Sequence, residues 1–176
     1  MSATVSNIVF DDIFTINAID KEGKKFDRVS RLYAHSKNYD MDLTLDYNVE
    51  LFPLQKDQSF ALALASSLAR GGRPAKTDGA ADTEEQDSHV WRPDGKGSRG
   101  LEDDYDYVMY GKVRRVLFYT KFTKFIFLKI YKFDGEAGEI VTAYISFGGL
   151  LMSLTGSFRH MTNIVLGDPV YLLMRK

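Results

Sequence analysis

Short runs of residues that alternate between apolar and polar side chains recur along this chain. Alternation with a period of two places successive side chains on opposite faces of a β-strand, and few segments fit the period of an amphipathic helix. The clearest run, MDLTLDY, spans 41–47, and its Asp42, Thr44 and Asp46 are expected on a wet outer face. The high aromatic content, with 12 Phe and 10 Tyr, also suits strands.

About eight short strands are expected. They fall within 14–18, 29–33, 41–47, 60–65, 105–110, 140–147, 150–158 and 170–174. The alanines and leucines of 60–65 leave a helix there as an alternative. Turns are marked by Gly23 in the segment 21–25 and by Gly148 and Gly149. This pattern predicts an all-β domain, an antiparallel barrel or sandwich.

The segment 69–102 differs from the rest of the chain. It is rich in glycine and charged residues and poor in aliphatic ones. Such a composition cannot bury enough apolar surface to order itself, so a long disordered central loop is expected, with Trp91 as its single anchor. The chain of 176 residues is otherwise expected to form a single domain, 1–176.

Composition argues against several classes of function. The 23 basic and 24 acidic residues leave a net charge of −1, so no overall field attracts nucleic acid or membrane. There is no cysteine, and no apolar stretch is long enough for a membrane-spanning helix. The first ten residues lack a signal peptide, which favours a cytosolic or nuclear location.

The sequence also lacks an obvious catalytic or metal-binding pattern. None of the three histidines, His35, His89 and His160, has a partner at metal-ligand spacing. The acids at 11–12 and 103–106 could form a general acid and base pair, but are more readily interpreted as solvated or partner-docking charges. We therefore expect no catalytic residue, metal, cofactor or small-molecule substrate, and a hydrolase, for example, would lack its nucleophile.

One basic stripe follows the first expected hairpin and is diluted by acids; its cations are Lys21, Lys24, Lys25, Arg28, Arg31 and Lys37. Cations beside aromatic rings are typical of proteins that bind single strands regardless of sequence, because cations contact phosphates and rings stack on bases. The candidate residues for weak, non-specific nucleic-acid binding, within the region 20–44, are Lys24, Lys25, Arg28, Arg31, Tyr33 and Lys37.

Six strings in the chain are together characteristic of one family. They are FDDIF at 10–14, LTLDYNVELFP at 43–53, WRP at 91–93, DYDYVMYG at 104–111, SFGGLLM at 146–152 and YLLMR at 171–175. Over nearly its whole length the chain resembles the common subunit 8 of eukaryotic nuclear RNA polymerases I, II and III, in a fungal-like form.

This resemblance implies an antiparallel β-barrel related to the oligonucleotide-binding fold, without an active site. It implies docking on the largest subunit of polymerases I, II and III, a nuclear location that includes the nucleolus, and a role in transcription. The family's region corresponding to 20–44 has been linked to weak single-stranded DNA binding. The alternative is a stand-alone single-stranded nucleic-acid-binding module of the same fold.

The segment 113–129 departs from the family pattern, with five basic residues, no acidic ones and four Phe. It could be a lineage-specific hairpin or arm, or a basic amphipathic segment for a partner or lipid surface. The third reading is an unspliced intron, because a Val codon begins GT, a Lys codon can end AG, and 17 residues correspond to 51 nucleotides, which keeps the frame. Its removal would join MYGK to IYKFD and restore the family spacing.

Overall fold

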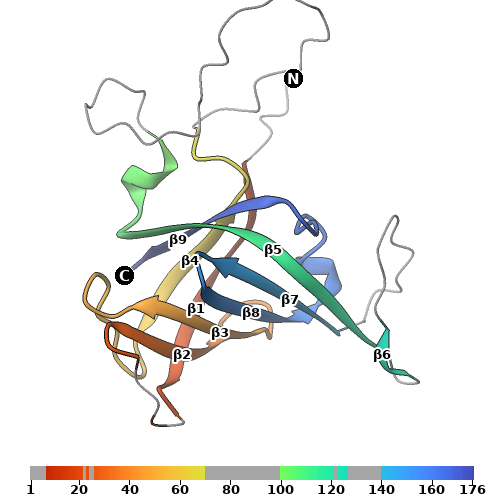
Figure 1. Cartoon of the computed structure of the whole chain (residues 1–176), viewed down its shortest axis with the longest axis horizontal. Helices are drawn as coiled ribbons and strands as arrows, with labels where there is room; N and C mark the ends of the chain where they lie inside the picture. Colours follow the sequence, from red (N-terminus) through yellow and green to blue (C-terminus); the bar gives the residue numbers. More distant parts are fainter. Residues whose placement is uncertain (1–6, 22, 24–25, 70–99, 121–122, 127–139) are drawn as a thin grey trace, which may run out of the picture.

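The computed structural model describes residues 7–21, 23, 26–69, 100–120, 123–126 and 140–176 (Figure 1). Nine strands lie in these parts of the chain: β1 (Ile8–Ile19), β2 (Val29–Ser36), β3 (Asp42–Asn48), β4 (Ser59–Ala65), β5 (Tyr107–Thr120), β6 (Thr123–Ile126), β7 (Ile140–Phe147), β8 (Leu150–Ser157) and β9 (Pro169–Arg175). Two short 3₁₀ helices accompany them, η1 (Leu101–Asp104) and η2 (Phe158–His160).

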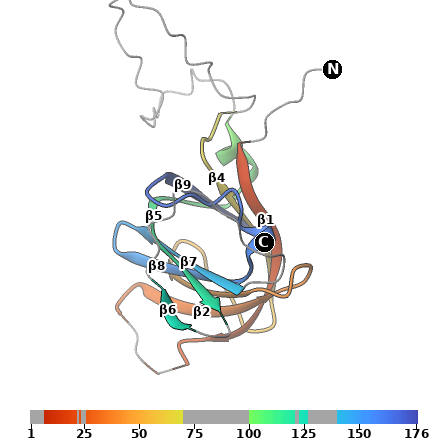
Figure 2. The ribbon, with the colours of Figure 1, turned by 90° about the vertical axis from the view of Figure 1, so that its right-hand side faces the viewer.

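The strands form one antiparallel sheet that closes on itself. Its order is β6-β5-β7-β8-β3-β2-β1-β4-β9, and a further pairing of β5 with β9 completes the ring (Figure 2). Every strand of this sheet but β6 belongs to the closed part, so the barrel has eight strands, and closure leaves these strands no free edge along the pairing. The expected all-β barrel is confirmed.

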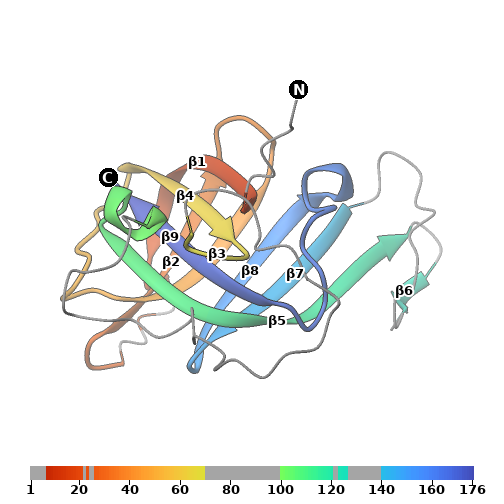
Figure 3. The ribbon, with the colours of Figure 1, turned by 90° about the horizontal axis from the view of Figure 1, so that it is seen from above.

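The ninth strand, β6, is not among the eight expected strands, and it lies within the atypical segment 113–129, for which a hairpin was one of the interpretations. Instead of ending near Gly111, β5 continues to Thr120 and pairs with β7 from Lys112 onward. Figure 3 shows the far end of β5 and β6 extending away from the body of the barrel. The sequence pattern missed this extension because 113–120 shows no clear alternation of apolar and polar residues.

The barrel interior is filled by apolar side chains from every strand of the ring. Phe14 of β1 and Phe60 of β4 stack with their ring centroids 6.1 Å apart, and both are almost completely buried. Residues 59–65 form β4, which pairs with β1 along its length, so the helical alternative is excluded. Burial of such aromatic and aliphatic surface is the main stabilising contribution to a fold of this kind.

The turn between β7 and β8 has the expected pair of glycines. Phe147 pairs with Leu150, and the intervening Gly148 and Gly149 have φ values of 61° and 105°. Positive φ at both central residues is the requirement of a tight two-residue hairpin turn. The predicted glycine corner is therefore confirmed.

Asp46 lies on the outer face of β3, which was expected to be wet. It is buried, because Arg31 on the neighbouring strand β2 holds its carboxylate.

The expected disordered loop 69–102 falls mainly on 70–99, outside the described residues. Its ends lie together, since Asn7 donates a 2.6 Å hydrogen bond to the carbonyl of Ala69 and the amide of Leu101 donates to that of Leu68.

Candidate nucleic-acid interface

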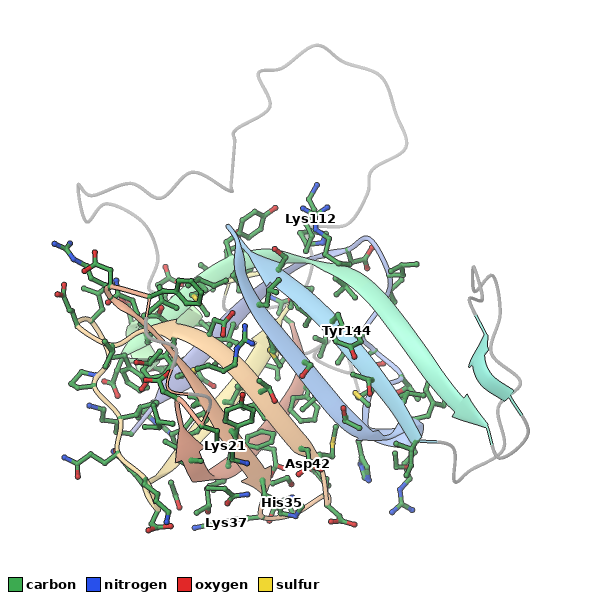
Figure 4. The ribbon with its side chains drawn as sticks, turned by 60° about the horizontal axis from the view of Figure 1, so that its bottom comes forward. Lys21, His35, Lys37, Asp42, Lys112 and Tyr144 are labelled. Carbon is green, nitrogen blue, oxygen red and sulfur yellow. The ribbon has the colours of Figure 1, made fainter. Side chains whose placement is uncertain are left out.

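The predicted stripe lies on the outer face of β2 and in the connections at its two ends. Arg31 and Tyr33 alternate with buried residues of β2, so their side chains point outward, and Lys37 is exposed just beyond the strand (Figure 4). Arg28 is exposed just before it. Lys24 and Lys25 lie outside the described residues. The structure thus places four of the six predicted residues along one strand.

Arg31 is engaged within the protein. Its Nε and Nη2 donate hydrogen bonds of 2.6 and 2.9 Å to the two carboxylate oxygens of Asp46. Asp46 also accepts a 3.2 Å hydrogen bond from the amide of Leu151 on β8. This two-bond geometry is the strongest form of arginine and carboxylate pairing. Arg31 therefore has a structural role, and its charge is largely neutralised for a phosphate.

Two other cations of the stripe have partners of different strength. Arg28 lies 3.4 Å from Glu50, but both side chains are more than half exposed, so the pair contributes little and can exchange for another anion. Lys21 places its ammonium 4.6 Å from the ring centroid of Tyr33. This cation–π contact covers one face of the ring that was predicted to stack on a base.

Acidic residues surround the far end of β2. His35 contacts Asp42 through Nδ1 at 2.9 Å and Asp40 through Nε2 at 3.3 Å. Lys37, the remaining described cation of the stripe, lies in the same connection as Asp40, and Asp42 begins the strand that follows it. A phosphate approaching this end of the barrel would meet both signs of charge.

Buried hydrogen bonds fix the connection between β2 and β3. Asp12 of β1 is buried and accepts hydrogen bonds from the Ser36 hydroxyl and, at 2.6 Å, from the Asn38 side-chain amide. Ser36 in turn accepts from the amides of Asn38 and Tyr39. Asp12 is thus a structural residue, and the interpretation of 11–12 as solvated or partner-docking charges is wrong for Asp12, because its carboxylate is buried and bonded within the protein.

The sequence did not point to Tyr144, which lies on the same outer surface as Tyr33. Directly paired residues link the two tyrosines across the sheet, because Tyr33 pairs with Thr44, Thr44 with Ser153 and Ser153 with Tyr144. Partners in register point to the same face, so the rings are separated by three strand spacings, about 14 Å. The alternation within 140–147 was the available signal, but it does not reveal which strands become neighbours.

A small open groove lies at the start of the stripe, between Asp20, Phe26 and Arg31. Its volume is about 80 Å³, far below the roughly 300 to 1,000 Å³ of typical small-molecule sites. Within the described parts of the chain there is no group of three or more His, Cys, Asp or Glu side chains arranged to hold a metal ion. No helix among the described residues is long and apolar enough to cross a membrane.

The fold and this surface together define a class of protein. The described strands form a closed antiparallel barrel, and Arg31 and His35 on the outside of β2 are paired with carboxylates of β3. The protein is a closed β-barrel whose outer strands present charged and aromatic side chains.

Comparison with known proteins identifies the family of this barrel protein. The chain belongs to the RNA polymerase Rpb8 family, whose model matches residues 11–126 and 117–176. It is 38% identical to the DNA-directed RNA polymerases I, II, and III subunit RPABC3 of Saccharomyces cerevisiae, over 98% of this chain and 100% of that protein. It is 37% identical to the DNA-directed RNA polymerases II, IV and V subunit 8B of Arabidopsis thaliana, over 97% and 98%.

Proposed function

We propose that this protein is a non-catalytic, shared subunit of nuclear RNA polymerases I, II and III that docks on the largest subunit. The observation that carries the proposal is the full-length similarity, since the alignment with the yeast subunit spans 98% of this chain and the whole of that subunit. Membership of all three enzymes entails a nuclear location, with the nucleolus included through polymerase I. Its contribution to transcription is the stability of the assembled enzyme.

The structure supports an assembly role through its rigid barrel and its exposed apolar side chains. Val108 and Tyr110 of β5 are large apolar residues that are exposed on the outside of the barrel, two positions apart on the same face of the strand. Exposed apolar side chains that lie close together on a well-packed barrel indicate surfaces that a partner covers.

Affinity purification tests the proposal. The tagged full-length protein should recover the large subunits of all three polymerases in equal molar amounts from a nuclear extract. Recovery of the protein without polymerase subunits would refute it. Localisation of a fluorescent fusion to nucleus and nucleolus gives an independent readout, and exclusion from the nucleus would contradict the proposal.

Weak binding of single-stranded DNA or RNA is the second candidate function. It is favoured by the placement of Tyr33 and Tyr144 in one row of paired residues on the outer face. Because Arg31 is paired and acids lie nearby, few cations are left for phosphates, so such binding would be weak and its salt dependence shallow. Reversing the charges of Lys24, Lys25 and Arg28 should weaken binding to an oligothymidylate while polymerase assembly is retained.

We also propose that residues 113–129 are absent from the working subunit, as retained intron sequence. The two segments matched by the family model overlap at 117–126, which lies inside this stretch. Excision would leave the pairing of β5 with β9, which involves Tyr107 to Lys112, untouched. The β7–β8 hairpin would be preserved as well.

A further inference from the structure

A second apolar cluster lies on the outside of the barrel, over β4 and β9. Its members are the buried side chains of Ala63, Ala65, Tyr171 and Leu173. Because adjacent residues of a strand point to opposite faces, these side chains point away from the interior that Leu62, Leu64 and Leu172 fill. They are buried because Ile8 at the start of β1 and chain segments beyond the ends of the strands pack against them.

The covering segments come from both sides of 70–99. Partly buried Ile8, Leu68, Leu101 and Tyr105 pack against the cluster. Leu101 belongs to η1, which Figure 1 shows beside the C-terminal strand. Together these residues form a roof over the outer faces of β4 and β9.

The roof covers only part of the apolar outer face. On β5, next to β9, Val108 is 37% and Tyr110 is 54% exposed. Val108 pairs with Leu173 and Tyr110 with Tyr171, and the two tyrosine rings lie with centroids 5.0 Å apart. The apolar surface therefore continues from the covered cluster onto β5, where no described residue covers it fully.

The border of this surface is acidic on the side where η1 lies, whereas exposed Lys112 borders it further along β5. η1 carries Glu102, Asp103 and Asp104 in a single turn. Asp11 pairs with Ala63 at the opposite side of the cluster. The charges of Asp11 and Asp104 contribute to raising the pKa of Tyr105, after burial, which places these carboxylates near the roof.

Glu102 has an incomplete hydrogen-bond set. Burial is the main cause of the raised pKa of Tyr171, and the Glu102 carboxylate adds to it. Among the described residues the buried Oε2 of Glu102 has no hydrogen-bond donor. Such a carboxylate is costly, and a cation that a partner places beside it would offset part of that cost. The Arg175 guanidinium is committed to the Tyr105 ring at 5.8 Å and does not fill this place.

We propose that the surface formed by Val108, Tyr110 and Tyr171, together with the acidic turn η1, is a docking site for a basic and apolar segment of a large polymerase subunit. The proposal rests on the function proposed above and assigns the surface that performs it. Apolar side chains of the partner cover Val108 and Tyr110, while an Arg or Lys beside them donates to Glu102. Hydrophobic contact and charge complementarity then act together.

The acidic border argues against other occupants. A nucleic-acid strand would bring phosphates against the carboxylates of η1 and be repelled. A second copy of this chain in a two-fold arrangement would bring η1 against the same acidic surface of its partner. In a segment with Arg or Lys beside apolar residues, the apolar side chains cover Val108 and Tyr110, and the cation lies beside the Glu102 carboxylate.

The test is co-purification of large polymerase subunits with tagged full-length variants. The double variant Val108→Lys, Tyr110→Arg should recover at least tenfold less large subunit than wild type. The matched control is Leu51→Arg, Leu151→Lys, which makes the same kind of change at exposed residues of other faces and should recover wild-type amounts. Equal recovery by the double variant and wild type, or an equal loss in the control, would overturn the docking site.

A milder variant covers the case in which the double variant does not fold. Glu102→Gln, Asp103→Asn, Asp104→Asn keeps the size of every side chain in η1, so its melting temperature should match that of wild type. We expect it to lower recovery severalfold and to make the remaining binding less sensitive to salt. Unchanged recovery would refute the electrostatic part. If wild type itself recovers no polymerase subunit, the proposed function fails instead.

Discussion

The guanidinium of Arg31 on β2 and the carboxylate of Asp46 on β3 face each other across paired positions, joined by hydrogen bonds of 2.6 and 2.9 Å. Asp46 also accepts from the Leu151 amide on β8, so the carboxylate links three adjacent strands. A residue predicted from sequence to contact phosphates thus stabilises the barrel.

Replacing Arg31 by Ala should therefore destabilise the fold. The change leaves Asp46 buried and without its strongest donor, at a cost of about 1 to 3 kcal/mol in the free energy of unfolding. The lower part of this range is expected because 45% of the Arg31 side chain is exposed to solvent. Urea denaturation measures the loss. Arg28→Ala, which breaks only the exposed pair with Glu50, is the control and should change stability by less than about 0.5 kcal/mol.

The pairing of Arg31 with Asp46 shows which features of the basic stripe the sequence could predict and which it could not. Alternation within 41–47 correctly predicted a strand whose Asp42 and Thr44 point outward. It could not show that Asp46 is buried, because burial depends on the register that places Arg31, 15 residues earlier, directly opposite. Charge patterns along a strand are visible in sequence, whereas the charges of neighbouring strands become apparent only after folding.

The second apolar cluster was missed for a related reason. The run 170–174, VYLLM, is continuously apolar, so no alternation marks Tyr171 and Leu173 as outward-facing. Their burial depends on η1 and on 65–69, which are distant in sequence. By contrast, Val108 and Tyr110 alternate with Tyr107 and Met109, so the pattern of this run does separate the outward-facing side chains from the inward-facing ones.

Gly111 should tolerate no side chain. A Cβ built there would lie 2.3 Å from the Ser146 carbonyl oxygen and 2.5 Å from the Phe147 ring, at the point where β5 passes from pairing with β9 to pairing with β7. Gly111→Ala should lower the free energy of unfolding by about 1 to 3 kcal/mol through this overlap. Thermal or chemical denaturation would show the loss, and a wild-type midpoint would contradict the close approach.

The β7–β8 turn supplies a contrasting case. A Cβ at Gly148 or Gly149 meets no atom within 4 Å, so the restriction there is the positive φ alone. Gly148→Asn should be almost neutral, because Asn accepts φ near 61° in such turns. Gly149→Val, at φ 105°, should cost about 1 to 3 kcal/mol through backbone strain. Equal stability of the two variants in denaturation would contradict the turn assignment.

Tyr47 is expected to make the fold less stable at alkaline pH. The side chain is completely buried, its hydroxyl has no hydrogen-bond partner, and burial, with Asp20 and Tyr107 adding, raises its pKa to about 12. The unfolded chain releases this proton near pH 10, whereas the folded chain retains it. Stability from this group is therefore constant below pH 10 and falls between about pH 10 and 12, by about 1.4 kcal/mol per pH unit.

The comparison of wild type with Tyr47→Phe isolates this effect. The variant removes the ionisable hydroxyl and keeps the ring, so its unfolding free energy should decline less steeply above pH 10. At neutral pH it should be as stable as wild type or more so, because an unpaired buried hydroxyl is lost. Parallel pH profiles for the two proteins would show that Tyr47 does not retain its proton.

Deletion of 113–129 tests whether this segment belongs to the working subunit. Val113 is buried and points inward, and in the shortened chain Ile130 would follow Lys112 and take that inward position. An apolar residue thus replaces an apolar residue, and the alternation of β5 is preserved. The shortened protein should fold with at least wild-type stability and recover polymerase subunits.

A deletion shorter by one residue is the matched control. Removing 113–128 leaves Lys129 after Lys112 and places a lysine at the inward position of Val113, so this variant should be strongly destabilised. The native form can be read directly from the protein isolated with polymerase. Its intact mass should lack 17 residues, and the tryptic peptide 116–121 should be absent. Recovery of that peptide from purified polymerase would show that the segment is translated and retained, and β5 would then carry its extension within the assembled enzyme.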